Sequence, residues 1–213
     1  MIIGRFMTKN PVFINPDVTV TEIRSLMDKE KIGHIPVLNK DNELVGLMTR
    51  KDIIKAGPSA ITSLDMYEVS YLLSRITVKD VMEKKVITVQ ENEVVEEAAR
   101  IMADNKIGCL PVMRGKLLVG IITDTDLFHF FVNAFGARHP GIRITLNLPE
   151  KPGQMAHLTH ALAEKGGNLV AVVTSEGDDL SHRRAILKVA GISRGDAEIC
   201  IKEMGDIEVE DIR

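Results

Sequence analysis

An internal duplication within residues 1–132 constrains the fold of this chain more than any other feature. The matching positions, at a constant offset, are Phe6-Met7 with Val81-Met82, Ile32-Gly33 with Ile107-Gly108, Pro36-Val37 with Pro111-Val112 and, after one deleted residue, 44–49 with 118–123 and Asp52 with Asp126. A unit of roughly 50 residues leaves apolar helix and sheet faces that it cannot bury alone. We therefore expect the two copies to pack together with pseudo-twofold symmetry.

Each copy shows the same order of predicted elements: strand, helix, strand, strand, helix. The first strands are predicted at 12–14 and 86–89, where β-branched residues are enriched. Thr19 and Glu22 have the spacing of a capping box, and helical stripes follow at Val20, Ile23, Met27 and at Val95, Ala98, Met102. We expect Gly33 and Gly108 to end these helices in the left-handed conformation. Strands at 35–38 and 44–49, and a short helix from Arg50, complete the first copy.

The C-terminal third has a different rhythm. Residues 142–148 alternate between apolar and polar, and Met155, Leu158 and Leu162 form a helical stripe. Strands at 169–173 and 185–189, a helix at 196–204 and a final strand at 207–212 give the βαββαβ order of a ferredoxin-like domain. The predicted fold class is therefore α+β. The predicted segments are repeat 1 at 1–56, a linker helix at 57–78 with Leu64, Tyr67, Tyr71 and Leu72 at helical spacing, repeat 2 at 79–132, a linker at 133–140 and the C-terminal domain at 141–213.

Composition argues against several classes of partner. The net charge of −3 and isoelectric point near 6.1 give no basic footprint for nucleic acid. The longest apolar stretch, 127–137, is too short to span a bilayer, and no signal peptide is recognisable, so we expect a cytoplasmic protein without membrane contact. Cys109 and Cys200 are predicted to be reduced structural thiols rather than a disulfide. His157 and His160 have metal-site spacing but lack a further ligand, so we predict no metal site.

Two motifs resemble those of the CBS domain, whose tandem pair is called a Bateman module. Gly-x-x-Pro-Val occurs at 33–37 and 108–112, and Gly-x-x-Thr-x-x-Asp occurs at 46–52 and 120–126. The resemblance implies that adenosine derivatives such as AMP, ADP or ATP bind in clefts between the repeats and regulate an attached or associated protein. It implies no catalytic cofactor.

Thr and Asp at a strand-to-helix junction suit such a ligand. A carboxylate accepts hydrogen bonds from ribose hydroxyls, and a helix N-terminus favours phosphate. The same residues also form an ordinary helix cap worth ~0.5–2 kcal/mol, but their duplication and the family pattern favour binding. The resemblance implies a first cleft at His34, Thr49, Arg50, Lys51, Asp52, Val86, Ile87, Ile107 and Gly108, and a weaker second cleft at Val12, Phe13, Ile32, Gly33, Cys109, Thr123, Thr125 and Asp126.

The two clefts are predicted to differ in charge. Arg50 and Lys51 in the first motif correspond to Asp124 and Thr125 in the second. Charge-assisted hydrogen bonds favour phosphate, whereas a carboxylate repels it. We therefore expect the first cleft to prefer phosphorylated nucleotides, and the second to stay empty or to take a less anionic adenosine compound. The alternative is that Arg50, Lys51 and Asp124 all point into solvent, which would leave the clefts equivalent.

The C-terminal domain resembles the ACT domain through Pro152-Gly153 and Gly167-Asn168. This resemblance implies an amino-acid site at Gly153 and Asn168, although Lys151 stands where an acidic residue is usual. The whole arrangement resembles the acetoin-utilisation accessory proteins of bacteria. We predict a regulatory sensor that relays an adenosine signal to a partner or to its ACT-like domain; the alternatives are an assembly adaptor with empty clefts and an enzyme of unrecognised chemistry, although no nucleophile or P-loop motif is present.

We also expect a homo-oligomer, most simply a dimer, because paired repeats leave an apolar helical face. Four of the six phenylalanines fall in one predicted helix, at Phe128, Phe130, Phe131 and Phe135. Such a run forms either core or a contact surface.

Overall fold

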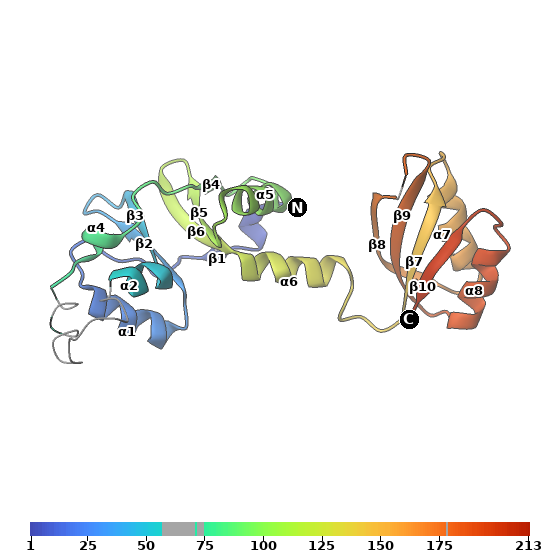
Figure 1. Ribbon diagram of the computed structural model, residues 1–213, viewed down its shortest axis with the longest axis horizontal. Coiled ribbons are helices and arrows are strands. Elements are labelled where there is room, and N and C mark those ends of the chain that lie inside the picture. Colours follow the sequence, from blue (N-terminus) through green and yellow to red (C-terminus); the bar gives the residue numbers. More distant parts are fainter. Residues whose placement is uncertain (57–70, 72–74, 178) are drawn as a thin grey trace. The chain divides into compact units, whose positions relative to one another are not determined.

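The computed structural model describes residues 1–56, 71, 75–177 and 179–213, which form two units, Met1–Leu127 and Phe128–Arg213 (Figure 1). The first unit holds the two repeats and the second holds the C-terminal domain. The boundary between them falls inside helix α6 (Asp124–Ala134). The linker helix predicted within 57–78 falls mostly on residues outside the described ranges. At its end, the Arg75 guanidinium lies 4.8 Å from the centre of the Tyr71 ring.

The first repeat begins with helix α1 (Val20–Glu30), continues through the antiparallel hairpin β2 (His34–Leu38) and β3 (Leu44–Thr49), and ends with α2 (Arg50–Ala56). The predicted capping box is confirmed: Thr19 Oγ1 accepts from the Glu22 amide at 3.3 Å, and Glu22 Oε2 accepts from the Thr19 amide at 2.9 Å. Ile23 and Met27 are fully buried against β2 and β3 residues, so the helical stripe faces the core as expected.

The second repeat has the same order, with α5 (Val95–Asn105), β5 (Cys109–Arg114), β6 (Leu117–Thr123) and α6. The predicted first strands are much shorter than expected. The strand at 86–89 becomes β4 (Val89–Gln90), parallel to β5, and the strand at 12–14 becomes a single bridge between Ile14 and Val37. Pro11 has no N–H to donate to a ladder, and Val12 and Phe13 remain exposed.

The opening segments of the two copies are exchanged. The segment with η1 (Ile3–Arg5) belongs to the second repeat, because the Ile3 amide donates to the Glu93 carbonyl at 2.8 Å. The segment with α4 (Val78–Val81) belongs to the first repeat, because the Val78 amide donates to the Val18 carbonyl at 2.9 Å. Ile3 and Val78 are both fully buried. The two repeats are therefore interlocked rather than merely adjacent.

The motif glycines are explained by this exchange. Strand β1 (Thr8–Lys9) pairs with β6, and Glu83 forms the equivalent bridge to Leu47 on β3. A Cβ on Gly120 would lie 2.4 Å from Met7 Sδ, and one on Gly46 would lie 2.3 Å from Met82 Sδ. Glycine is needed at both positions because a methionine from the other copy's opening segment lies directly over the backbone.

The prediction that Gly33 and Gly108 are left-handed was wrong. The left-handed residues are Lys31 and Lys106, the C-caps of α1 and α5, with φ of 55° and 54°. Neither glycine has a positive φ. A Cβ on Gly33 would meet no atom within 4 Å, whereas one on Gly108 would lie 3.2 Å from Asp124 Oδ2. The left-handed C-cap of each helix thus lies two residues before its glycine.

The C-terminal domain has the predicted ferredoxin-like topology. Its elements are β7 (Ile142–Pro149), α7 (Gln154–Glu164), β8 (Asn168–Glu176), β9 (His182–Ala190), α8 (Arg194–Lys202) and β10 (Glu208–Ile212). The antiparallel sheet has the order β10-β7-β9-β8. Both helices cover the same face of this sheet (Figure 1), and Leu158, Leu162 and Ile201 are fully buried there.

The phenylalanines of α6 and the two cysteines differ in burial. On α6, Phe130 is buried, whereas Phe128 and Phe131 are 65% and 46% exposed, so the phenylalanine run supplies both core and surface. Cys109 and Cys200 are buried free thiols. Among the described residues, no helix is long and apolar enough to cross a membrane.

Candidate ligand pocket between the repeats

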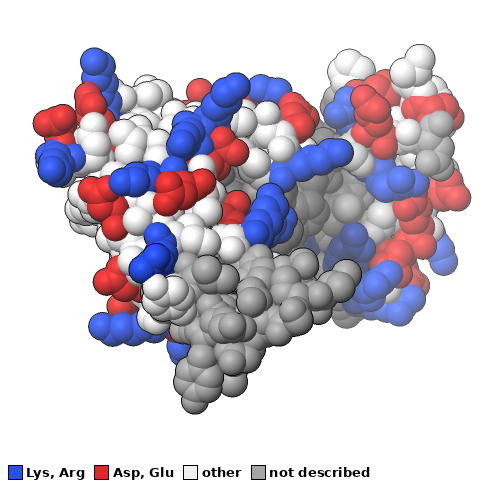
Figure 2. All heavy atoms as spheres, turned by 60° about the vertical axis from the view of Figure 1, so that its left-hand side comes forward, with Lys and Arg blue, Asp and Glu red and all other residues white. Residues whose placement is uncertain are grey.

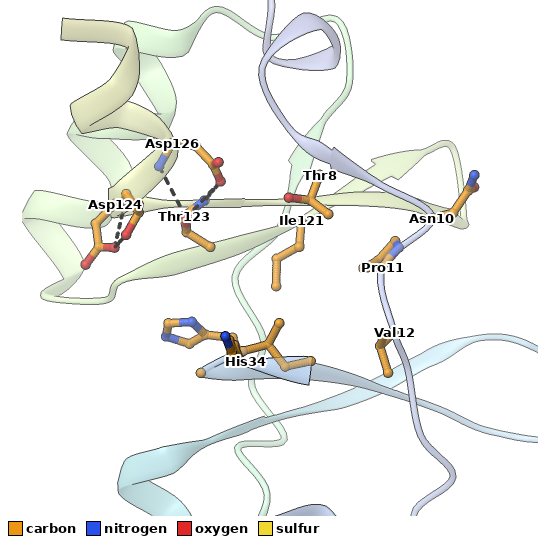
Figure 3. Close-up of a pocket in the computed structure, with 13 residues that line it drawn as sticks. Thr8, Asn10, Pro11, Val12, His34, Ile121, Thr123, Asp124 and Asp126 are labelled. Carbon is orange, nitrogen blue, oxygen red and sulfur yellow. Dashed lines mark hydrogen bonds between the residues drawn. The ribbon is translucent and has the colours of Figure 1, made fainter. Parts of the chain in front are cut away.

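A cavity of about 480 Å³ lies between the two repeats and is formed by both. The second repeat contributes Ile121, Thr123, Asp124, Thr125 and Asp126; the first contributes Thr8, Asn10, Pro11, Val12, Lys31, Ile32, Gly33 and His34. Figure 3 shows Thr123 and Asp126 on one side, with Pro11, Val12 and His34 on the other. We call this cavity the Thr123 pocket. Its volume is within the roughly 300–1,000 Å³ typical of small-molecule sites.

The Thr-x-x-Asp motif forms the same hydrogen bonds in both repeats. Asp126 Oδ2 accepts from the Thr123 amide and from Thr123 Oγ1, both at 2.8 Å. Asp52 Oδ2 accepts from the Thr49 amide at 2.9 Å and from Thr49 Oγ1 at 2.6 Å. The helix-cap interpretation is therefore correct for both copies. It does not exclude binding, because Oδ1 of each aspartate takes no part in these bonds.

Asp124 occupies the α6 N-terminus inside the pocket. Its Oδ1 accepts from the Thr125 amide at 2.6 Å and lies 3.3 Å from Thr125 Oγ1. The Asp124 amide donates to the Gly108 carbonyl at 3.0 Å, and the Asp126 amide donates to Thr123 Oγ1 at 3.3 Å. The first three amides of this helix are thus already hydrogen-bonded within the chain.

His34 lies in the Thr123 pocket rather than only beside Thr49, where we placed it from the sequence. It is the first residue of β2 and pairs with Thr49, but its Nε2 reaches within 3.7 Å of the Cβ position of Gly108, close to Asp124. Burial lowers the pKa of His34, with Asp124 and Asp52 opposing that shift and Lys51 adding to it. His34 therefore lies near charged groups of both motifs.

The Arg50 side chain contacts α1. Its guanidinium donates to Asp28 Oδ1 at 2.7 Å and to the Met27 carbonyl at 3.1 Å. Both acceptors lie near the C-terminal end of α1, where the helix dipole favours a cation. The guanidinium is thus held at the end of α1 while about half of the side chain stays exposed, and a contribution of Arg50 to the first cleft stays a prediction.

Other residues predicted for the first cleft lie in varied surroundings. Val86 packs beside Leu47, Cys109 and Ile121 and also lines a separate cavity of about 440 Å³ with Lys84 and Lys116. Ile87 is 37% exposed. Ile107 and Gly108 follow α5, with Gly108 beneath Asp124 and His34. Lys51 is exposed in the first turn of α2.

More of the residues predicted for the second cleft than of those predicted for the first lie together in one cavity. Val12, Ile32, Gly33, Thr123, Thr125 and Asp126 all line the Thr123 pocket. Phe13 instead lines a neighbouring cavity of about 250 Å³. Cys109 does not belong to the pocket, because its thiol is buried in the core, which raises its pKa to about 12.

Sequence reasoning missed several residues that line the pocket, namely Thr8, Asn10, Pro11, Lys31 and Ile121. Thr8 to Pro11 follow the matched pair Phe6-Met7 and Val81-Met82 directly. That match was the available signal. It marks an opening segment shared by both copies, and the residues that follow this segment could have been considered as lining for the other repeat's cleft.

The two residues predicted for an amino-acid site are not close in one chain. Gly153 is the N-cap of α7, with φ of 89°, and follows the end of β7 at Pro149. Asn168 begins β8 and pairs with Ala190, at the end of the sheet where β7 begins. Because β7 and β8 both run antiparallel to β9, Gly153 and Asn168 lie at opposite ends of the sheet.

Surface charge and the histidines of α7 bear on nucleic-acid binding and on a metal site. Lys and Arg side chains are interspersed with Asp and Glu on the face shown in Figure 2. On α7, His160 Nε2 lies 3.5 Å from Glu164 Oε1. Within the described ranges, no three His, Cys, Asp or Glu residues are grouped to hold a metal ion.

Comparison with known families identifies the first unit. The CBS domain model matches residues 3–59 and 78–133. This chain belongs to the CBS-domain family. Its C-terminal domain, residues 140–213, matches the TTHA0829-like ACT domain. CBS and ACT domains are typically regulatory and non-catalytic.

Solved structures support the same fold for the CBS pair. A protein described as an acetoin utilization protein, AcuB, from Vibrio cholerae is 28% identical, with a TM-score of 0.54, and the match covers 65% of this chain and 95% of that one. The CBS pair of MJ0100, solved with 5′-methylthioadenosine and S-adenosyl-L-methionine, is 25% identical, with a TM-score of 0.53, over 65% and 98% of the two chains. CBSX2, solved with AMP, is 26% identical, with a TM-score of 0.51, over 62% and 96%.

Curated relatives include proteins of different length. MJ1426 of Methanocaldococcus jannaschii, described as uncharacterized, is 31% identical over 147 residues, which are 58% of this chain and 88% of that protein. A homoserine O-acetyltransferase of Methanosarcina acetivorans is 29% identical over 132 residues, 62% of this chain. The chain spans only 22% of that enzyme. The likeness to enzymes is therefore partial.

Proposed function

We propose that this protein is a non-catalytic sensor that binds an adenosine-containing small molecule in the Thr123 pocket and passes the signal to a partner protein or to its ACT-like domain. The observation that carries this proposal is the pocket itself, a cavity of about 480 Å³ with residues of both repeats facing it. A ligand held there contacts both halves of the CBS pair, so its binding free energy favours one arrangement of the repeats over others.

The lining suits an adenosine compound. Asp126 Oδ1 is placed to accept from ribose hydroxyls, and Pro11, Val12, Ile32 and Ile121 supply apolar contact for a flat base. Family members solved with AMP or with S-adenosyl-L-methionine support this class of ligand. The resemblance to AcuB supports acetoin utilisation as the process regulated, and both that process and a cytoplasmic location remain predictions.

The main alternative is an assembly adaptor whose clefts stay empty. Thermal unfolding of the full chain with AMP, ADP, ATP, S-adenosylmethionine or NADH separates the two, with GMP as a control for the base. A ligand at 100 times its Kd adds about 2.7 kcal/mol to the free energy of unfolding. We expect at least one adenosine compound, and not GMP, to raise the melting temperature. If none does so at millimolar concentration, the adaptor is the better function.

Assembly into a homodimer is a further part of the proposal. Ile54 on α2 is 75% exposed, and Phe128 on α6 occupies the corresponding position in the second repeat and is 65% exposed. Large exposed apolar side chains of this kind often mark an interface between subunits. Sedimentation equilibrium should give twice the 23.5 kDa mass of one chain. A single-chain mass at micromolar concentration would contradict it.

An amino acid remains a predicted second ligand of the ACT-like domain, although Gly153 and Asn168 cannot both contact it in one chain. Calorimetry with the common amino acids tests this, and absence of heat would leave the domain as an assembly element.

A further inference from the structure

The charged lining of the Thr123 pocket is unusual for a site that would hold phosphate. The groups that face it are Lys31, His34, Asp124 and Asp126. Lys31 is exposed, so solvent and salt screen its ammonium. Burial lowers the pKa of His34, which disfavours the charged imidazolium. Two carboxylates therefore face a single screened cation.

The backbone donors that a phosphate would use at the start of α6 are already occupied. Helix N-termini bind anions through free amides in the first turn. Here the amides of Asp124, Thr125 and Asp126 donate to the Gly108 carbonyl, Asp124 Oδ1 and Thr123 Oγ1. The Asp124 carboxylate therefore lies where an incoming anion would bind the start of α6.

The strongest cation near the motifs is also directed elsewhere. Arg50 stands at the position of Asp124 in the first repeat, yet its guanidinium bonds to Asp28 and the Met27 carbonyl. Among the residues that line the Thr123 pocket there is no arginine.

We propose that the Thr123 pocket selects adenosine compounds whose 5′ substituent is neutral or positively charged, such as a thioether or a sulfonium, over those that carry phosphate. Asp124 imposes this selection by repelling anionic groups and by attracting cationic ones. The inference rests on the proposed function, because it concerns the ligand of the same pocket.

Isothermal titration calorimetry of the full chain at 0.15 M salt tests the selection. The compounds are 5′-methylthioadenosine, S-adenosylmethionine, AMP and ATP, which share the adenosine and differ in charge. The variants are Asp124→Asn, which removes the charge and keeps the acceptor for Thr125, and the control Asp41→Asn, in an exposed turn. Melting temperatures establish that each variant is folded.

We expect the wild-type protein to bind 5′-methylthioadenosine and S-adenosylmethionine at least tenfold more tightly than AMP, and ATP least tightly. Asp124→Asn should narrow the preference over AMP to less than threefold, while Asp41→Asn leaves it unchanged. Effects of this size follow from one unit charge a few ångströms from the ligand at a protein surface. Tighter binding of AMP or ATP by the wild type, or an unchanged preference in Asp124→Asn, would overturn the proposed selection but not the proposed function. If no compound binds, the proposed function fails as well.

Discussion

The two Thr-x-x-Asp motifs of this CBS pair have the same internal hydrogen bonds but different neighbours. At Thr123 the motif faces Pro11, Val12 and His34 across the Thr123 pocket. At Thr49 the next residue, Arg50, reaches back to α1 instead. The motif is thus a structural element in both repeats. What it can bind depends on the residues opposite and on the one residue that follows the threonine.

This difference separates two roles that the sequence motif combines. The aspartate caps a helix wherever the motif occurs, and the cap contributes ~0.5–2 kcal/mol to stability. Ligand binding needs in addition a cavity lined by the other repeat. Paired substitutions at equivalent positions can therefore separate the structural role from the functional one, because each variant in one repeat has its control in the other.

The largest difference is expected for Asp126→Ala against Asp52→Ala. Both variants lose the same cap, so their free energies of unfolding should fall by similar amounts. Only Asp126→Ala removes the carboxylate from the Thr123 pocket. A hydrogen bond to a charged group is worth about 1.5–3 kcal/mol, so affinity for the adenosine ligand should fall by roughly ten- to a hundredfold. Asp52→Ala should change it less than threefold.

Calorimetry with the tightest ligand, together with urea denaturation, measures both quantities. Loss of binding in Asp52→Ala with full binding in Asp126→Ala would place the ligand at Thr49, as the charges of Arg50 and Lys51 first indicated. Equal losses would mean that both clefts bind or that the cap alone matters.

Alanine at the two glycines that face the interlocked methionines Met7 and Met82 should lower the free energy of unfolding in both repeats. A methyl group at Gly120 would lie 2.4 Å from Met7 Sδ and 3.0 Å from the Thr8 carbonyl oxygen, whereas the three atoms nearest to one at Gly46 all belong to the Met82 side chain. Overpacking of this kind costs about 1–3 kcal/mol. We expect both alanine variants to be destabilised, and Gly120→Ala more than Gly46→Ala, because backbone yields less than a flexible side chain.

Urea denaturation measures the two losses. Met7→Ala combined with Gly120→Ala should cost less than the sum of the single changes, because Met7→Ala relieves the clash that Gly120→Ala creates. Additive losses would show that Met7 does not constrain Gly120.

A smaller and symmetric effect is expected at the two left-handed lysines. A non-glycine residue in this conformation costs roughly 1 kcal/mol. Lys31→Gly and Lys106→Gly should therefore each raise the free energy of unfolding by about 0.5–1 kcal/mol, measured in urea. Because Lys31 is the one lysine or arginine among the described residues that line the Thr123 pocket, Lys31→Gly alone should weaken binding of AMP. An equal change in AMP binding by both variants would contradict this role.

The fold was more predictable from the sequence than the pocket. The duplication, the capping box at Thr19 and the ferredoxin-like order of the C-terminal domain depend on local patterns, and the structure contains all of them. The exchange of opening segments has no local signature, since it is decided by which repeat Ile3 and Val78 are buried in. It is this exchange that places Thr8 beside Ile121 on β6, and Pro11 and Val12 on the other side of the Thr123 pocket.

The charge of each cleft was the part that sequence comparison predicted least well. The comparison counted Arg50 and Lys51 as cations of the first cleft. The direction of the Arg50 side chain depends on Asp28 and on the Met27 carbonyl near the end of α1, and neither is marked by the motif. Similarly, His34 and Cys109 are equivalent in sequence, but one lines a pocket and the other is core.

The smallest effect is expected from His34 and Cys109, through the dependence of the free energy of unfolding on pH. Burial lowers the folded-state pKa of His34 below its unfolded value of 6.5. Between these two pKa values the unfolded chain binds more protons, so stability rises with pH and is lost as pH falls below 6.5. Burial raises the pKa of Cys109 from 9.0 to about 12, so the unfolded thiol ionises first and stability is lost as pH rises above 9.0. Urea denaturation between pH 5 and 10 should show the acid loss reduced in His34→Gln and the alkaline loss reduced in Cys109→Ala. An acid limb that is unchanged in His34→Gln would mean that the imidazole is as well solvated in the folded protein as in the unfolded chain, and the contrast between the two repeats would then not extend to this position.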